Sequence, residues 1–247
     1  MENNSKEKGH LHPSTIVSRD LLKIFMDLGF EVIDGPEVES EHYNFDMLNF
    51  PKDHPARDMQ DTFWIKNSPH TVLRTHTSNT QVRYMEKHKP PLRVVSFGRV
   101  FRAEATDATH EAQFYQVEGL VVDETTSVAH MKGALLEVCQ KIFGEKTKIR
   151  LRPSFFPFVE PGFEVDVTCF KCSGKGGMCS LCKGTSWVEV VGAGMVQPAV
   201  LKNGGVDPDK YQGYAFGFGF DRLVMLKYGI DDIRHLYSGD LRLINQF

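Results

Sequence analysis

The segment with the richest chemistry places charged and aromatic residues on one face of two consecutive predicted strands. Arg102 and Glu104 are two residues apart at the end of a strand predicted over 92–102, and so share a face. The return strand, predicted over 113–122, carries three more residues on one face: Phe114, Gln116 and Glu118. One face of the antiparallel hairpin would therefore carry a cation, two carboxylates, an amide and an aromatic ring. These groups could bind a phosphate, an adenine and an ammonium group. The pattern also fits an exposed hairpin face with solvated charges.

A second segment, 217–222, joins two glycines to an arginine at the expected start of a helix. Glycine lets the backbone approach a ligand closely, and the first turn of a helix presents outward-pointing N–H groups. The dinucleotide-binding pattern is not met, because a third glycine and a βαβ context are missing. Arg222 together with Arg102 would suit a polyphosphate, since each guanidinium binds phosphate as a planar fork. The alternative is a surface arginine at a helix start.

Four of the five cysteines form a paired pattern in which the spacings are two, six and two residues: Cys169, Cys172, Cys179 and Cys182. Four thiolates at this spacing can surround a tetrahedral zinc at about 2.3 Å per bond, and the glycines between them allow tight turns. Free thiols and disulfides are the alternatives, and disulfides are disfavoured in a reducing cytosol. An iron–sulfur cluster would use the same ligands but has no supporting context. Cys139 lies in a helical pattern and is predicted to be a core residue.

Composition describes an ordinary soluble protein of 247 residues, with 41% hydrophobic residues and a net charge of −3. No apolar run approaches the roughly 20 residues needed to cross a bilayer. The net charge argues against broad, charge-driven binding of nucleic acid, so another domain or subunit would have to hold such a partner. Residues 1–9 are polar, lack the apolar core of a secretion signal, and are predicted to be a disordered lead-in. We therefore expect a cytoplasmic protein without a membrane partner.

The first 143 residues predict three helices, at 14–28, 75–88 and 128–143. The first and third show apolar residues at helical spacing, and the second begins with hydroxyl-bearing residues that can cap a helix. Ser14 is the expected cap of the first helix, and glycines follow the first and third. A short strand is expected at 30–33. The segment 37–63 is rich in charges and aromatics and is predicted to be a long, irregular functional loop.

The second half predicts mainly strands, at 149–152, 163–168, 186–196 and 214–219, before a helix at 220–228. The segment 153–161 should interrupt the first of them, and the cysteine pattern should join the second and third. Strands that follow strands, with few βαβ crossovers, indicate the α+β class, with an antiparallel sheet flanked by helices. No repeat or low-complexity linker is present, so we expect one domain.

Several segments together resemble class II aminoacyl-tRNA synthetases. Residues 98–102 with 106–111 resemble the second signature motif of that family, 217–222 the third, and 29–39 the first. Other segments resemble one branch of the family, the α subunits of bacterial phenylalanyl-tRNA synthetases: 9–13, 54–59, 73–78 and 155–161. The resemblance covers essentially the whole chain after Gly9, with its motifs in the order of the family.

The resemblance implies a six- or seven-stranded antiparallel sheet with flanking helices in a catalytic domain at 10–247. The cysteine pattern at 169–182 is absent from many members of the family, and its spacing predicts a zinc knuckle inserted in this domain. The resemblance also implies the reaction. The carboxylate of phenylalanine attacks the α-phosphorus of ATP to give phenylalanyl-adenylate and pyrophosphate, and the aminoacyl group then moves to tRNA(Phe). No protein nucleophile is needed, so catalysis would depend on positioning and charge stabilisation.

The resemblance assigns the nucleotide to one set of residues. Arg102 would bind the α-phosphate and stabilise its growing charge, and Arg222 would bind the γ-phosphate with His110 nearby. Phe114 would stack on adenine, while Glu104 would contact the nucleotide or the substrate ammonium. A second set would bind phenylalanine. Its polar head would meet His76, Ser78, Gln116 and Glu118, and its ring would meet Phe156, Phe158 and Ala215.

The resemblance implies Mg²⁺ at Glu160, shared with a β subunit, although this residue also fits a surface carboxylate. For Phe156 and Phe158 the alternative is plain core packing. The family forms an α2β2 heterotetramer with the β subunit, whose interface would involve 16–39. Its α subunit starts with a helical hairpin that contacts tRNA and precedes the part seen here, so we expect adenylate chemistry to survive and tRNA charging to suffer. The alternative function is that of a free-standing or regulatory paralogue without full tRNA charging.

Overall fold

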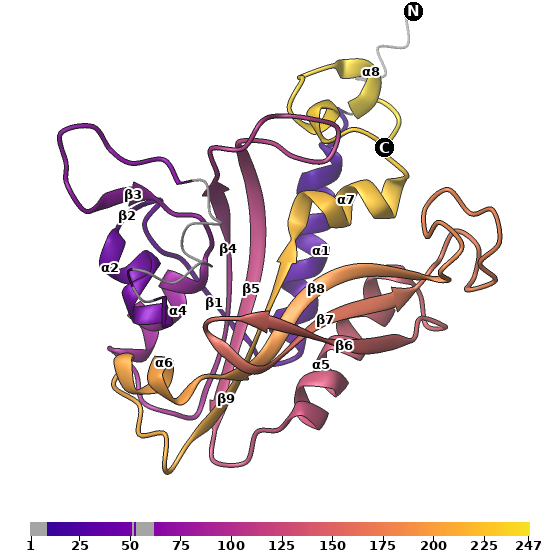
Figure 1. The fold of residues 1–247 in the computed structure, drawn as a ribbon. Coiled ribbons are helices and arrows are strands. Elements are labelled where there is room, and N and C mark those ends of the chain that lie inside the picture. The colour runs from indigo at the N-terminus through magenta and orange to yellow at the C-terminus, as the bar shows by residue number, and fades with distance from the viewer. Residues whose placement is uncertain (1–8, 51, 53–61) are drawn as a thin grey trace, which may run out of the picture.

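A seven-stranded sheet forms the centre of the computed structural model, which describes residues 9–50, 52 and 62–247 (Figure 1). Across the sheet the strands are β1 (Glu31–Ile33), β4 (Leu92–Phe101), β5 (Gln113–Asp123), β9 (Gln212–Gly219), β8 (Trp187–Val196), β7 (Val159–Thr168) and β6 (Ile149–Phe156). Neighbours are antiparallel except for the edge pair β1 and β4, which is parallel. The predicted α+β class with flanking helices is confirmed, and the sheet is mixed rather than wholly antiparallel.

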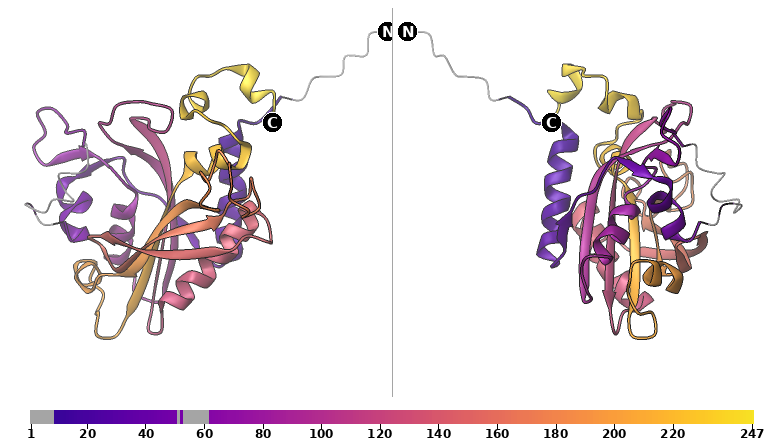
Figure 2. Two further views of the ribbon diagram at one scale, coloured as in Figure 1. Left: turned by 45° about the vertical axis from the view of Figure 1, so that its right-hand side comes forward. Right: turned by 90° about the vertical axis from the view of Figure 1, so that its left-hand side faces the viewer.

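One face of the sheet is covered by α1 (Pro13–Asp27), α5 (Val128–Phe143) and α7 (Phe220–Tyr228), whose apolar residues share one core with the strands. In the right-hand view of Figure 2, α1 stands along this side of the sheet. The predicted helix 128–143 is confirmed to the residue. The first helix is confirmed with a different cap, because Nδ1 of His12 accepts the N–H of Ser14 at 3.2 Å. Among the described residues no helix is long and apolar enough to cross a membrane.

The opposite face is covered by α4 (Ser78–Met85), α6 (Pro198–Asn203) and the 3₁₀ helix η1 (Asp46–Leu48), which bury a second apolar cluster. Strand β5 serves both faces. Val117 and Val121 face the first core, whereas Leu120 and Val122 face the second. This alternation also sends the other even-numbered residues of β5 to the second face.

The prediction of an irregular loop over 37–63 is wrong for its first part. Here β2 (Val38–Ser40) pairs with β3 (Thr71–Leu73), and α2 (Glu41–Asn44) leads into η1. Phe45, Met47, Leu48 and Phe50 are buried in the second core. These elements are too short to show a period, and β2 is completed by a partner about thirty residues away. The motif at 54–59 lies outside the described residues, as does most of the predicted lead-in.

Two other boundaries differ from the predictions. Strand β6 does not stop at Arg152 but runs to Phe156, so the expected interruption at 153–161 is reduced to a tight turn into β7. Pro153 is tolerated because β6 is an edge strand, where a missing N–H need not break a ladder. The predicted helix 75–88 begins only at Ser78 in α4, because Thr75–Thr77 lead into it without being helical.

The last elements, η2 (Ile233–Leu236) and α8 (Leu241–Ile244), lie beside the start of α1 (Figure 1). Nδ1 of His10 is 2.7 Å from the carbonyl oxygen of Phe247. The hairpin of β7 and β8 extends to the right in Figure 1, and its connecting segment contains the four paired cysteines. The sheet therefore offers two separate places for chemistry, one over its centre and one at this tip.

Candidate functional site

A cavity of about 570 Å³ lies on the second face of the sheet, and separate segments of the chain line it. Ten of the residues predicted from sequence are brought together there: His76, Ser78, Arg102, Glu104, Phe114, Gln116, Glu118, Phe156, Phe158 and Ala215. The hairpin face is therefore not an isolated solvated surface. It forms part of the wall of a concave site of the size that small ligands occupy.

The central strands explain why the cavity is hollow. Along β5 the cavity side carries an aromatic ring, then polar groups, then an apolar side chain: Phe114, Gln116, Glu118 and Leu120. The residues paired with the last three on β9 are Gly219, Gly217 and Ala215. Large side chains on one strand thus face small ones on the next. A Cβ added at Gly217 would lie 3.1 Å from Cγ of Glu118, so a larger residue would press against the side chain of Glu118.

Glu118 is the buried acid of the cavity, with only 6% of its surface exposed. It accepts hydrogen bonds from the hydroxyl of Ser78 and, at 3.3 Å, from the backbone N–H of Thr77. Burial raises the pKa of Glu118 above its ordinary value, while these donors oppose the shift. The segment leading into α4 therefore holds the carboxylate in place and adds Ser78 to the wall.

Arg102 is half-buried at the cavity wall. Its Nε donates to the carbonyl of Thr75 at 3.3 Å, its guanidinium lies 5.0 Å from the ring centroid of Phe114, and its Nη1 is 3.8 Å from Glu104. Burial lowers the pKa of this arginine, yet it remains a cation at any physiological pH. Strand β4 ends at Phe101, so Arg102 and Glu104 lie just beyond the strand rather than on it. Their predicted proximity nevertheless holds.

Some polar atoms of the wall have no well-formed hydrogen bond to any described residue. Neither ring nitrogen of His76 makes a well-formed hydrogen bond to a described residue, and Oε1 of Gln116 makes none. Burial lowers the pKa of His76 to about 3, and the nearby Arg102 adds to the effect, so the imidazole is neutral. Unpaired buried polar atoms destabilise a protein. Those that line an open cavity indicate a ligand that would supply the missing partners.

The aromatic part of the wall comes from the turn between β6 and β7. The ring centroids of Phe156 and Phe158 are 5.9 Å apart with an interplanar angle of 24°, and Phe158 is 5.9 Å from the ring of Phe50. Both predicted rings line the cavity together with Ala215. Plain core packing does not describe them fully, because each also borders open space.

Three of the residues predicted to bind ATP or Mg²⁺ do not line the cavity. Arg222 lies in the first turn of α7 at the rim, where its Nε donates to the carbonyl of Glu189 at 3.4 Å. His110 is exposed on the loop between β4 and β5, with its Nδ1 3.0 Å from the carboxylate of Asp107. Glu160 is exposed on β7. Their predicted roles are therefore not supported by this cavity alone.

Sequence reasoning missed several lining residues. Gln81 is buried in α4 and follows Ser78 by three residues, a helical spacing that could have identified it. Gly192 on β8 lines the cavity, and a Cβ added there would lie 3.2 Å from Cζ of Phe156. Glu164 and Glu189 also line the wall and are joined through Arg152 at 2.8 and 3.3 Å. These contacts join different strands, so no local pattern reveals them.

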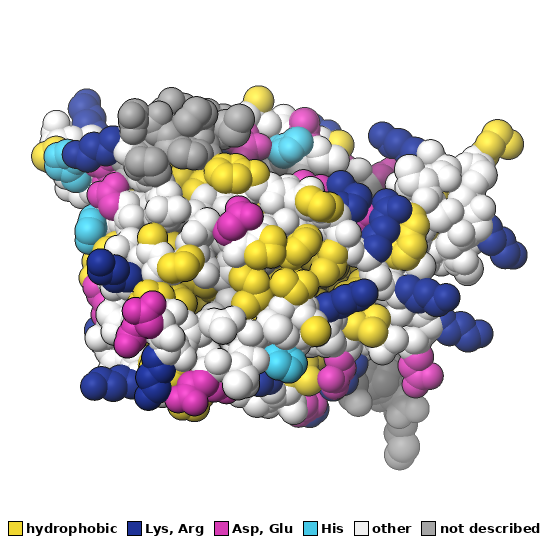
Figure 3. All heavy atoms as spheres, turned by 60° about the horizontal axis from the view of Figure 1, so that its bottom comes forward, with side chains coloured by type: hydrophobic (Ala, Val, Ile, Leu, Met, Phe, Trp, Pro, Cys, Tyr) yellow, Lys and Arg dark blue, Asp and Glu magenta, His cyan; other side chains and the backbone are white. Residues whose placement is uncertain are grey.

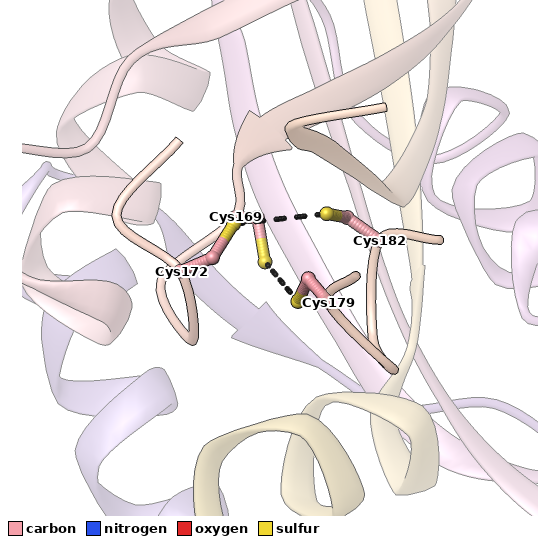
Figure 4. A group of neighbouring side chains, drawn as sticks. All are labelled: Cys169, Cys172, Cys179 and Cys182. Atoms are coloured by element: carbon pink, nitrogen blue, oxygen red, sulfur yellow. Dashed lines mark hydrogen bonds between the residues drawn. The ribbon is translucent and has the colours of Figure 1, made fainter. Parts of the chain in front are cut away.

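The four paired cysteines form a cluster of their own at the hairpin tip (Figure 4). We call residues 169–182 the cysteine knuckle. Sγ of Cys169 is 3.7 Å from Sγ of Cys179, and Cys172 and Cys182 are 3.7 Å apart, far beyond a disulfide bond of about 2.05 Å. Sulfurs around a tetrahedral zinc with bonds of about 2.3 Å lie about 3.8 Å apart. All four Sγ atoms are within 4.8 Å of one another, so the cluster could hold a metal ion.

The backbone of the cysteine knuckle supports such a site. Each cysteine carbonyl accepts a backbone N–H from three to five residues ahead, at 2.9 or 3.0 Å, which closes two tight turns. The N–H of Cys182 donates to Cys179 and, with that of Leu181, lowers the pKa of the Cys179 thiol to about 6. A depressed pKa favours the thiolate that a metal needs. The ring of Phe170 stacks on Phe143 of α5 at 5.2 Å and fixes the knuckle to the fold.

Comparison with known proteins supplies a second line of argument. Residues 1–247 match the family described as tRNA synthetases class II core domain (F). The chain is 56% identical over 241 residues to proteins named phenylalanine–tRNA ligase alpha subunit from Bacillus pumilus (strain SAFR-032) and Bacillus subtilis (strain 168). It is 55% identical over 242 residues to the protein of the same name from Streptococcus agalactiae serotype Ia. Each match covers 97% of this chain and 69% of the relative.

Proposed function

The chain belongs to the phenylalanine–tRNA ligase α subunits, within the class II tRNA synthetase core family, and from this premise we propose its reaction. It activates L-phenylalanine with ATP to phenylalanyl-adenylate, and the aminoacyl group is then transferred to tRNA(Phe). One observation carries the proposal. Residues predicted to bind the two substrates, though far apart in sequence, line one cavity in which buried polar atoms have no hydrogen-bond partner among the residues that the structure describes.

The cavity suits the chemistry of adenylate formation. An oxygen of the phenylalanine carboxylate forms a bond to the α-phosphorus of ATP while the bond from that phosphorus to the bridging oxygen breaks, and pyrophosphate leaves with the electron pair. Negative charge on the α-phosphate oxygens is stabilised by Arg102, which is held by Thr75 and Phe114 before any ligand binds. Such preorganisation is what makes a fixed cation effective in a transition state.

The nucleotide and the amino acid would occupy different parts of the wall. Adenine stacks on Phe114, and Arg222 at the rim reaches the γ-phosphate with His110 on the neighbouring loop. Glu104 contacts the nucleotide or the ammonium group. The ammonium and carboxylate of phenylalanine meet the polar groups around Glu118: His76, Ser78 and Gln116. Oε1 of Gln116 then accepts a hydrogen bond that none of the described residues provides.

The benzyl side chain would lie against Phe156 and Phe158, with Ala215 at the bottom of its pocket. Rings in such pairs contribute about 0.5–1.5 kcal/mol beyond their burial. The pocket wall near Ala215 is apolar, with Leu120 paired to it and Val196 and Val200 close by. A tyrosine hydroxyl would find no partner there, which disfavours tyrosine by roughly 10²-fold.

Two metal ions belong to the proposal. Zn²⁺ is bound by the cysteine knuckle, where the sulfur spacing and the lowered pKa of the Cys179 thiol both fit a tetrathiolate site. Its role would be structural rather than catalytic, since none of the four cysteines lines the cavity. The metal would hold together the two halves of the hairpin tip. Mg²⁺ accompanies ATP and would neutralise phosphate charge. Glu160 is exposed outside the cavity, so its Mg²⁺ role depends on ligands from a partner subunit.

The partners follow from the α-subunit family. We propose that a β subunit completes an α2β2 enzyme, that tRNA(Phe) is bound mainly by parts other than this domain, and that the enzyme works in the cytoplasm. The net charge of −3 agrees with the second statement. On the face seen in Figure 3, hydrophobic side chains gather near the middle with cationic side chains along one side. An exposed apolar patch supports a protein partner.

ATP–pyrophosphate exchange tests the proposal. The chain, alone and in complex with the β subunit of a relative, is assayed with each of the twenty amino acids. We expect exchange that depends on phenylalanine and exceeds that with tyrosine by roughly 10²-fold. A complex that is silent with phenylalanine would instead support a regulatory paralogue, and no observation on the described residues favours that alternative.

A further inference from the structure

Asp221 is a buried carboxylate that the proposed reaction does not yet use. It is 3% exposed in the first turn of α7, directly before Arg222. Its Oδ2 accepts the backbone N–H of Tyr115 at 2.6 Å, and the hydroxyl of Tyr237 also donates to it. Among the residues that the structure describes, no ion pair neutralises it. Burial raises its pKa to about 6. Such a group is costly, so its hydrogen bonds need an explanation.

The position of Tyr115 supplies that explanation. The ladder between β5 and β9 ends where Gln116 pairs with Gly219, because the chain then leaves β9 and begins α7. Tyr115 is the next residue of β5, and its N–H points toward a strand that is no longer there. The carboxylate of Asp221 takes the place of the missing strand carbonyl. The sheet thereby stays ordered at the point where the helix begins.

The hydrogen bond between Asp221 and Tyr115 fixes the relative position of two parts of the candidate site. Tyr115 lies between Phe114 and Gln116, both of which line the cavity, while Asp221 is followed by Arg222 at its rim. One carboxylate thus joins the floor that would hold adenine to the turn that would hold the γ-phosphate. Gly219, the last residue of β9, also lines the cavity, so the junction is at the site itself.

The C-terminal segment braces the same junction from outside. Tyr237 follows η2, whose first residue, Ile233, donates its N–H to the carbonyl of Ala108 at 2.9 Å. Ala108 is on the loop between β4 and β5 that carries His110. The segment therefore contacts both the loop and Asp221, and it limits movement of one relative to the other.

We propose that Asp221 is a positioning residue for ATP: through its hydrogen bond to Tyr115 it holds Arg222 in register with Phe114. The inference rests on the proposed function for the identity of the ligand. Removal of the carboxylate lets the start of α7 move relative to β5. ATP binding then weakens, while the phenylalanine pocket, built on other contacts, stays intact.

Kinetics of pyrophosphate exchange distinguish this role from simple stabilisation. Asp221→Ala is expected to raise KM for ATP roughly 10-fold or more, as loss of a hydrogen bond to a charged group does, with KM for phenylalanine changed less than about twofold. Asp221→Asn keeps an oxygen that can accept the Tyr115 N–H and should restore most of the affinity. Val138→Ala in α5 is the matched control, because it destabilises the core far from the cavity and should leave both KM values unchanged.

Two further measurements keep the outcome decisive. Should Asp221→Ala not fold, Tyr237→Phe removes only the outer hydrogen bond and should raise KM for ATP about threefold. Equilibrium dialysis with labelled ATP measures the affinity for ATP without the need for turnover. If the Asp221 and Tyr237 variants exchange pyrophosphate at the wild-type rate and bind ATP as tightly as the wild type, the inference is overturned. The proposed function would not be affected by that result. A wild type that binds ATP but exchanges no phenylalanine would overturn the function, whereas weaker ATP binding in the variants would still support the positioning role.

Discussion

The cavity lies over the middle of the sheet, between β5, β9 and α4, whereas the cysteine knuckle lies at the far end of the β7–β8 hairpin. Both gather groups that bind ligands. In the cavity, buried side-chain atoms of His76 and Gln116 have no hydrogen-bond partner among the described residues, and Glu118 and Arg102 both border open space. In the knuckle the sulfurs face one another at 3.7 Å, and the backbone around them is closed by its own hydrogen bonds.

The difference indicates two uses of binding energy. A site that turns over substrates must leave polar groups ready for ligands that arrive and depart, and it accepts some loss of stability in return. A structural metal site is satisfied permanently, so its ligands and turns can be closed tightly around one ion. Changes in the cavity should therefore alter reaction rates or specificity, and changes in the knuckle should alter stability. The following predictions test that division in order of their expected effect on activity.

Replacement of Arg102 should have the largest effect. Arg102→Ala removes the preorganised cation beside the reacting phosphate and is expected to lower the rate of pyrophosphate exchange 10²–10³-fold, as loss of a transition-state donor does elsewhere. Arg102→Lys should recover little, because a point charge does not reproduce the planar fork. The measurement is exchange at saturating ATP and phenylalanine.

Arg93→Ala is the matched control for this prediction. Arg93 is also on β4, but its guanidinium lies over Phe30 and its Nη1 donates to the carbonyl of Leu28, away from the cavity. Its loss should leave exchange within about twofold. An Arg102→Ala variant that kept more than a tenth of the wild-type rate would show that another group stabilises the phosphate.

A change at Ala215 should alter specificity rather than rate. Ala215→Gly enlarges the pocket beside Leu120 and should admit p-chlorophenylalanine, with a rise in exchange of roughly 10-fold or more and little change with phenylalanine. Ala215→Val is the reciprocal variant and should reduce exchange with phenylalanine by overpacking. If neither variant changes the preference, the substrate ring binds elsewhere in the cavity.

Some cavity-lining residues could be predicted from the sequence because a local pattern determines which way they face. Strand alternation alone placed Phe114, Gln116 and Glu118 on one face, because the side-chain period of a strand is two. The resemblance then added His76, Ser78 and the aromatic pair, which no periodicity could have brought to the same wall. The helix 128–143 was equally visible, since it combines helical spacing, a capping serine and a closing glycine.

What escaped prediction depends on contacts between distant strands. Gly192 matters only because Phe156 comes from another strand to within reach of its absent Cβ. The burial of Phe45 and Phe50 follows from packing under α4 and α6, not from any period in their own segment. Asp221 was part of a recognised motif, yet its role became visible only when β9 was seen to end one residue short of Tyr115.

Loss of the knuckle metal should have the smallest effect on activity and a clear effect on stability. Cys172→Ser removes one ligand, so bound zinc should fall from one per chain to near zero and the melting temperature should drop by about 5–15 °C, if the clip contributes a few kcal/mol. Cys139→Ala is the matched control: this cysteine is buried in α5 outside the cluster, so its variant should keep the zinc.

Below the melting temperature, pyrophosphate exchange by Cys172→Ser should stay within about threefold of wild type, because no knuckle residue lines the cavity. A much larger loss would mean that the hairpin tip holds β8, and with it the carbonyl of Glu189 that orients Arg222, in the geometry that ATP requires. The two regions would then be one coupled site.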